Sequence, residues 1–163
     1  MSKRSDYIKK EYTVAQSAYM AGIMDGEGTF YIGNYSGNRK NGDKHFQTLI
    51  AVATTDKSLM EWLFNTFGGG FREYTPKQMA KNSRKKVYRW QATSNRMLHI
   101  CELILPHLVI KKRQAEIMIE IRKTFNDAQN IKGRQHVQNL PKGILELRQT
   151  LMDELKLLHT RNH

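Results

Sequence analysis

The sequence predicts an α+β fold in which an antiparallel sheet of four strands is backed by helices. Helical and strand patterns follow one another in the order α-β-β-α-β-β-α-α, and one further helix stands at the C-terminal end. Turn-forming residues join the two strands of each pair, so paired strands run antiparallel. We expect one face of the sheet to rest on the helices and the other face to form a long basic saddle.

The chain is predicted to be a single domain that covers residues 1–163. A length of 163 residues suits one domain, with residues 1–12 as a basic N-terminal arm and residues 141–159 as a C-terminal helix. Apolar residues make up 39% of the chain, a low fraction that fits a protein completing its burial by dimerising. Cys101 is the only cysteine, so an internal disulfide and a C-x-x-C zinc site are excluded, and we expect it to be buried.

The charge of the chain favours a nucleic acid as its partner. The formal net charge is +12 and the pI is near 9.9, so the natural partner is a polyanion. A membrane partner is not expected, because no segment has the apolar run of a spanning helix and no basic amphipathic helix is prominent. The first residues lack the apolar core of a secretory signal. We therefore expect an intracellular protein, either in the cytoplasm or, if organelle-encoded, in a chloroplast or mitochondrion.

The first helix is predicted to run from a Thr13 cap to about Gly26. Ala18, Gly22 and Gly26 recur every fourth residue and form a bare stripe along it. A glycine inside a helix costs about 1 kcal/mol relative to alanine, so we interpret the stripe as an interface with a second helix. Glu27 follows at the partially negative end of the helix dipole. In a dimer packed along the stripe, two such carboxylates would converge, and they would be stable as ions only around a metal.

The two strand pairs are predicted at residues 29–35 and 46–54, and within residues 71–93. In the first strand Phe30 and Ile32 face the core. The outer face of the second strand is unusually apolar. In the last strand Tyr88 and Trp90 point inward. The connections at residues 36–44 and 76–85 are rich in cations and are predicted to be basic loops.

Four further helices complete the predicted order. One begins at an Asp56 cap and stops at three glycines, residues 68–70. The next is capped by Asn95 and ends before Pro106, and another runs to about Thr124. Residues 126–140 are predicted to be loop. Pro141 opens the last helix, which ends near Leu158. Its predicted inner side consists of Leu147, Leu151 and Leu158.

The segment from Met20 to Gly28, M-A-G-I-M-D-G-E-G, resembles the LAGLIDADG motif of homing endonucleases. The residues identical in type are Ala21, Gly22, Asp25 and Gly28. Glu27 stands where the family has its metal-binding acidic residue. The chain has one copy of the motif, as in the homodimeric members of the family. A solvated turn after a helix would explain the acidic pair but not the stripe, and the spacing of a calcium-binding loop is absent.

This resemblance implies a homodimeric DNA endonuclease that cuts both strands of a long pseudo-palindromic site. It places Mg²⁺, with Mn²⁺ as a substitute, on Glu27 and on the backbone carbonyl of Gly26. It implies that Lys111 lies near the scissile phosphate. The family's water-organising residue follows the second strand, where this chain departs from the pattern; Thr55 is the candidate, and the assignment stays open among residues 54–56. The implied dimer interface consists of Ala18, Gly22, Asp25 and Gly26, with Asp25 expected to cap or pair rather than to bind metal.

The saddle and the basic loops supply the candidate DNA-binding residues. Cations in the loops are expected to contact phosphates, whereas side chains on the outer face of the sheet are expected to read bases. These candidates are Tyr31, Tyr35, Arg39, Lys40, Gln47, Arg72, Lys81, Arg84, Lys85, Arg89 and Gln91. The histidines show no triad or metal spacing and are interpreted as structural or surface residues.

Two other kinds of function remain open at this point. An intron RNA-binding maturase could use the same basic saddle without cutting DNA. A DNA-binding regulator could have lost catalysis, although the presence of Glu27 favours cleavage.

Overall fold

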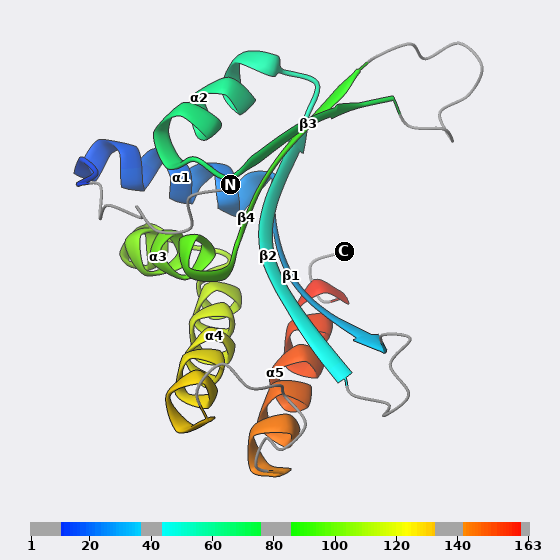
Figure 1. Cartoon of the computed structure of the whole chain (residues 1–163). Helices are drawn as coiled ribbons and strands as arrows, with labels where there is room; N and C mark the ends of the chain where they lie inside the picture. The colour runs from blue at the N-terminus through cyan, green and yellow to red at the C-terminus, as the bar shows by residue number, and fades with distance from the viewer. Residues whose placement is uncertain (1–10, 37–43, 76–85, 133–141, 161–163) are drawn as a thin grey trace.

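The four strands form one antiparallel sheet in the order β1-β2-β4-β3 (Figure 1). They are β1 (Gly28–Ser36), β2 (Lys44–Thr54), β3 (Gly70–Tyr74) and β4 (Val87–Thr93). The computed structural model describes residues 11–36, 44–75, 86–132 and 142–160. Residues 1–10 of the predicted arm, residues 37–43 of the first basic loop and the whole second basic loop, residues 76–85, lie outside the described residues. These segments include Arg39, Lys40, Lys81, Arg84 and Lys85. The α+β fold and the antiparallel sheet that the sequence predicts are confirmed.

One face of the sheet forms the floor of the core. Phe30 of β1, Ile50 of β2 and Trp90 of β4 are fully buried in one cluster with residues of the helices. The first helix, α1 (Val14–Gly26), and the third, α3 (Ser94–Ile104), lie on this side of the curved sheet with α2 (Lys57–Phe67) (Figure 1). Because alternate residues of a strand point to opposite faces, the other face carries the residues between these core positions.

The predicted starts of α1 and α2 are confirmed. The Thr13 side chain accepts a hydrogen bond from the Gln16 backbone N–H and the Gln16 side chain accepts one from the Thr13 N–H, a reciprocal capping box. Asp56 caps α2 through the Leu59 N–H. Gly68 ends that helix with a φ of 67°, a conformation that glycine adopts without steric cost.

The predicted cap of α3 is wrong. The helix begins at Ser94, directly after β4, and no side chain caps it. Asn95 instead accepts hydrogen bonds from the Arg122 guanidinium, at 3.0 Å from Nη2 and 3.3 Å from Nε. The Asn95 side-chain oxygen, which was predicted to cap α3, therefore accepts from Arg122 of α4 instead.

The fourth helix, α4 (Lys112–Lys132), is longer than predicted. We expected it to end near Thr124 because the residues that follow are polar, but no glycine or proline stands between Lys112 and Lys132. Arg148 of α5 also bonds Thr124, with Nε donating to Oγ1 at 2.8 Å and Nη2 to the carbonyl at 3.1 Å. Polar composition alone was therefore a poor stop signal.

The last helix, α5 (Lys142–Thr160), packs beside α4 (Figure 1), but its buried side differs from the prediction. Leu147 is 45% exposed, whereas Leu151, Met152 and Leu155 are buried. The buried stripe also includes Arg148, whose guanidinium lies over the Phe125 ring, 3.8 Å from its centroid. Leucines surround this helix on several sides, so spacing alone could not identify the face that packs.

Two further findings concern Cys101 and membranes. Cys101 is buried, as predicted, and this burial raises the pKa of its thiol.

None of the helices in the described part of the chain is long and apolar enough to cross a membrane.

Candidate active site and nucleic-acid interface

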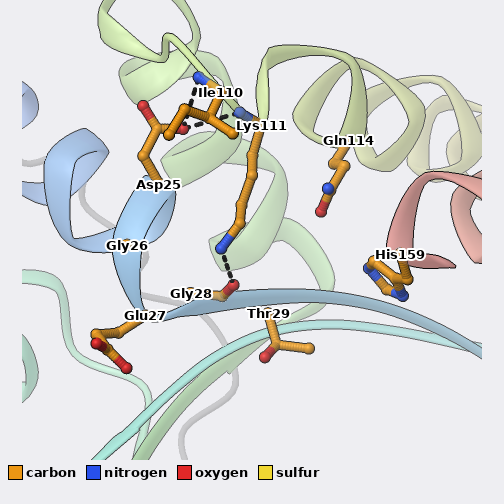
Figure 2. Close-up of a pocket in the computed structure, with 9 residues that line it drawn as sticks. All are labelled: Asp25, Gly26, Glu27, Gly28, Thr29, Ile110, Lys111, Gln114 and His159. Atoms are coloured by element: carbon orange, nitrogen blue, oxygen red, sulfur yellow. Dashed lines mark hydrogen bonds between the residues drawn. The ribbon is translucent and has the colours of Figure 1, made fainter. Parts of the chain in front are cut away.

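A pocket of about 670 Å³ opens where α1, β1, α4 and α5 meet (Figure 2). It lies at the end of α1, where the motif segment leads into β1. It is lined by Asp25, Gly26, Glu27, Gly28, Thr29, Ile110, Lys111, Gln114 and His159. The pocket therefore brings together both charged residues of the motif and Lys111, which the family resemblance implies to lie near the scissile phosphate.

Asp25 fixes the segment that leads into α4. Its Oδ2 accepts a hydrogen bond from the Val109 N–H at 2.8 Å, and its Oδ1 accepts from the N–H groups of Ile110 at 3.2 Å and Lys111 at 2.8 Å. A carboxylate is also favoured at the partially positive start of a helix. Asp25 was expected either to cap a helix or to pair at a helix interface. In this chain its carboxylate caps the segment that leads into α4.

Lys111 crosses the pocket from α4 toward the motif. Its Nζ donates to the carbonyl of Met24 at 3.0 Å and to that of Gly28 at 2.8 Å (Figure 2). An ammonium group has three donors, so one remains for a further acceptor. Burial lowers the pKa of Lys111, and the carboxylates of Asp25 and Glu27 oppose this shift. The result is a fixed, partly buried cation beside Glu27.

Glu27 forms the cap of α1 and leaves its carboxylate exposed at the pocket. Its backbone N–H donates to Ile23 at 2.8 Å, and Figure 2 shows the carboxylate directed away from Lys111. Carboxylate and carbonyl oxygens are ligands that Mg²⁺ prefers, so Glu27 and Gly26 fit such an ion chemically. Within the described residues, however, no group of three His, Cys, Asp or Glu could hold a metal ion.

The predicted water-positioning candidates lie elsewhere. Thr54 Oγ1 accepts from the Asp56 N–H at 3.2 Å, and Asp56 accepts from Ser58 Oγ at 2.6 Å. Both residues are thus engaged in the turn and cap that start α2. Thr55 is exposed between them and does not line the pocket.

Gln114 and His159 are pocket residues that the sequence analysis missed. Gln114 lies one helical turn after Lys111, a spacing that places both on one side of α4 and could have been noticed. His159 comes from the last turn of α5, and its sequence context indicates only a structural or surface residue. No sequence signal links it to residues more than a hundred positions earlier.

The open face of the sheet carries the other candidate residues. Strand register places Tyr31, Gln47, Arg72, Arg89 and Gln91 on the face opposite the buried Trp90. Tyr35 belongs to β1, but its side chain is outside the described residues.

Arg72 and Arg89 stand directly opposite each other on β3 and β4. Neither has an ion pair within the part of the chain that the structure describes. Like charges at opposed positions destabilise a sheet, so this pair is costly unless an anion covers it. Glu73 lies on the other face and pairs with Lys86 at 2.7 Å.

The stripe on α1 is bare and open. Ala18, Gly22 and Gly26 are exposed, and a Cβ added at Gly22 or Gly26 would meet no atom of the described residues within 4 Å. Packing within the described part of the chain therefore does not require either glycine. Close by, beside Asp25, Val109 is 85% exposed and Ile110 is 68% exposed.

Comparison with known proteins rests on structure. No family model and no curated protein sequence matches the chain. The homing endonuclease I-CvuI in complex with its target superposes with a TM-score of 0.67 at 18% identity, over 88% of this chain and 82% of that chain. The archaeal intron-encoded homing endonuclease I-Vdi141I, complexed with DNA, gives 0.66 at 16% identity, over 88% and 84%. The I-SmaMI LAGLIDADG homing endonuclease bound to cleaved DNA gives 0.62 at 14% identity, over 88% of this chain but 44% of that chain. Together with the element order and the sheet described above, these likenesses show that the chain has the fold of the LAGLIDADG homing endonucleases.

Proposed function

We propose that this protein is a site-specific DNA endonuclease that acts as a homodimer and hydrolyses phosphodiester bonds in both strands of a long pseudo-palindromic site. The observation that carries the proposal is the position of Glu27. Its exposed carboxylate ends α1 beside the fixed cation of Lys111, on a fold whose solved examples include homing endonucleases bound to DNA.

Double-stranded DNA fits the open face of the sheet. The opposed arginines Arg72 and Arg89 would be stabilised by an anion, and Gln91 and Gln47 stand on the same face. Guanidinium groups suit guanine and amides suit adenine in the major groove. The net charge of +12 supports the same partner, because it strengthens attraction to phosphates.

Homodimerisation would complete the site. The bare stripe on α1 lets a second α1 approach closely, and the exposed Val109 and Ile110 flank it with apolar surface. This chain matches 44% of the I-SmaMI chain, so two copies of it would match the length of that longer protein. Two copies would also bring two Glu27 carboxylates together at the ends of the paired helices.

The chemistry follows from the residues around the pocket. Glu27 and the carbonyl of Gly26, from both subunits, would hold the divalent ion. When bound, Mg²⁺ or Mn²⁺ supplies charge neutralisation at the phosphate and a more acidic water. Lys111 has one donor free for the phosphate, where its positive charge favours the extra negative charge of the transition state.

Substituting Glu27 tests the proposal. Glu27→Gln keeps the shape of the side chain but removes the charge that would bind metal. We expect Mg²⁺-dependent cleavage to fall by about 10²-fold or more, while the affinity for the DNA site remains. Glu102→Gln is the matched control, because Glu102 is an exposed glutamate on α3, away from the pocket.

Cleavage by the wild-type protein decides between the candidate functions. The target can be selected from a randomised library and cleavage followed with Mg²⁺ and with Mn²⁺. A protein that binds DNA or RNA tightly but cuts no DNA with either ion would contradict the nuclease proposal. That outcome would favour an RNA-binding maturase or a regulator that binds without cutting.

A further inference from the structure

Two polar side chains form the wall of the pocket that faces Lys111. Gln114, in the first turn of α4, is only 3% exposed, and Figure 2 shows its amide directed into the pocket. His159 reaches the same space from the last turn of α5. Neither side chain has a hydrogen bond to any described residue. The polar atoms of Gln114 and His159 are not among the buried atoms without a partner, so they open onto the pocket and can bond a polar guest there.

We propose that Gln114 and His159 position the water molecule that attacks the scissile phosphate. The inference rests on the proposed endonuclease function and identifies the water-positioning residues that the sequence left open. In the step it assigns, the water oxygen bonds to phosphorus and one ester P–O bond breaks. The water loses a proton to solvent, and the departing oxygen takes one up.

The alternative positions for this role are either engaged elsewhere or outside the pocket. Thr54 and Asp56 hold the turn and the cap at the start of α2, and Thr55 lies outside the pocket. Gln114 and His159 instead share the pocket with Glu27 and Lys111. The polar wall beside the proposed reaction site thus comes from α4 and α5 rather than from the end of β2.

The protonation state of His159 suits this role. Burial and, to a lesser extent, the positive charge of Lys111 lower the pKa of His159 from its ordinary value of 6.5. The other charged groups facing the pocket are the carboxylates of Asp25, already bonded to three N–H groups, and Glu27. Near neutral pH the imidazole is therefore uncharged, and one ring nitrogen can accept a hydrogen bond from water.

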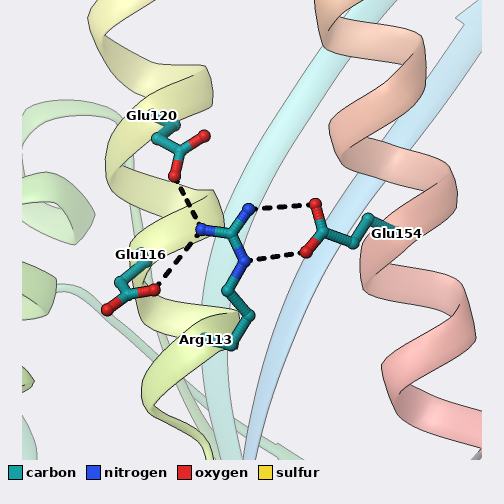
Figure 3. A network of polar contacts seen from close by, with 4 residues as sticks. All are labelled: Arg113, Glu116, Glu120 and Glu154. Atoms are coloured by element: carbon teal, nitrogen blue, oxygen red, sulfur yellow. Dashed lines mark hydrogen bonds and ion pairs between the residues drawn. The ribbon is translucent and has the colours of Figure 1, made fainter.

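A salt bridge joins α4 and α5 close to the pocket. Arg113, the residue before Gln114, bonds Glu154 of α5 through two parallel hydrogen bonds, at 2.7 Å from Nε and 3.0 Å from Nη2 (Figure 3). Its Nη1 also bonds Glu120 at 2.8 Å and Glu116 at 3.3 Å. The turn of α4 that carries Gln114 is thereby bonded to Glu154 of α5, which lies little more than one helical turn before His159.

The first test measures cleavage and binding separately. His159→Phe keeps a flat ring but cannot accept a hydrogen bond, and Gln114→Leu removes the amide. For each we expect the single-turnover cleavage rate to fall by about 10²-fold with the affinity for the DNA site unchanged. His159→Gln should recover part of the rate. His107→Gln is the control outside the pocket, and thermal unfolding checks that each variant folds.

The pH profile adds a readout that a structural role would not change. Protonated His159 cannot accept a hydrogen bond, so the wild-type rate should fall as the pH drops through its lowered pKa. His159→Gln should lose this fall. Wild-type cleavage rates in both His159→Phe and folded Gln114→Leu, or an unchanged pH profile in His159→Gln, would overturn the inference.

A titration that needs no cleavage tests the geometry alone. The pKa of His159, followed by NMR in the full chain, should rise in Lys111→Met, because a nearby positive charge is removed. Lys156→Met removes an exposed cation of the same helix and should leave that pKa unchanged. An unchanged pKa in Lys111→Met would refute the pocket arrangement. A wild-type protein that cuts no DNA would instead refute the proposed function, and with it the role of the water.

Discussion

At the scale of single residues, Gly28 shows how closely the motif is packed. A Cβ at Gly28 would lie 2.5 Å from Met24 Cα and 2.6 Å from its carbonyl oxygen, the oxygen that also accepts from Lys111. Gly28→Ala should therefore lower the free energy of unfolding by about 1–3 kcal/mol, because backbone must move to admit the methyl group. Urea denaturation measures this change.

A second glycine provides the control for Gly28. Gly143 lies near the start of α5, and a Cβ there would meet nothing within 4 Å. Gly143→Ala should stabilise the protein by up to about 1 kcal/mol through helix propensity. Equal effects of the two substitutions would contradict the packing described for Gly28.

The residues of the pocket differ in how far the sequence predicts them. Glu27 could be placed from the motif. Lys111 could be placed from the family resemblance, which has a lysine just before this helix, α4. Gln114 could have been found from its spacing to Lys111 on α4. His159 could not, because its place depends on how α5 packs against α4, and leucines on several sides of α5 leave that packing undetermined.

At the scale of elements, Asp25 joins the end of α1 to the start of α4. Asp25→Ala would leave the N–H groups of residues 109–111 without their acceptor, which should cost about 1–3 kcal/mol. Asp25→Asn keeps one acceptor oxygen and should lose less. The unfolding free energies of the two variants, compared by urea denaturation, check this order. A larger loss in Asp25→Asn than in Asp25→Ala would contradict the capping role.

Element types were easier to predict than element ends. The capping box at Thr13 and the glycines after α2 are local chemistry, and both predictions are confirmed. The two ends that were misplaced carry long-range contacts: Asn95, the predicted cap of α3, bonds Arg122, and Thr124, the predicted end of α4, bonds Arg148. Tertiary contacts of this kind leave no periodic signal in the sequence.

At the scale of the whole molecule, the open sheet face should read bases. Arg89→Ala and Gln91→Ala should each relax sequence preference at defined base pairs, with a loss of about 1–3 kcal/mol of discrimination. Lys123→Ala, an exposed cation on α4, is the control and should leave the preference unchanged. Selection of binding sites from a randomised library measures the preference. An unchanged profile in both sheet variants would refute the placement of this face in a DNA groove.

The bare stripe of α1 links the fold of one chain to the assembly of two. Gly22 is exposed and has open space where a side chain would stand, so Gly22→Leu should leave the isolated chain folded, with helix propensity slightly improved. In a dimer packed along the stripe, the same leucine would separate the two helices and move the two Glu27 carboxylates apart. Gly22→Leu should therefore be monomeric by sedimentation velocity and inactive in cleavage, whereas the control Gly143→Leu stays dimeric. The unfolding temperature of the wild-type protein should rise with concentration, and that of Gly22→Leu should not. A wild-type protein that sediments as a monomer while it cuts both strands would rule out the dimer.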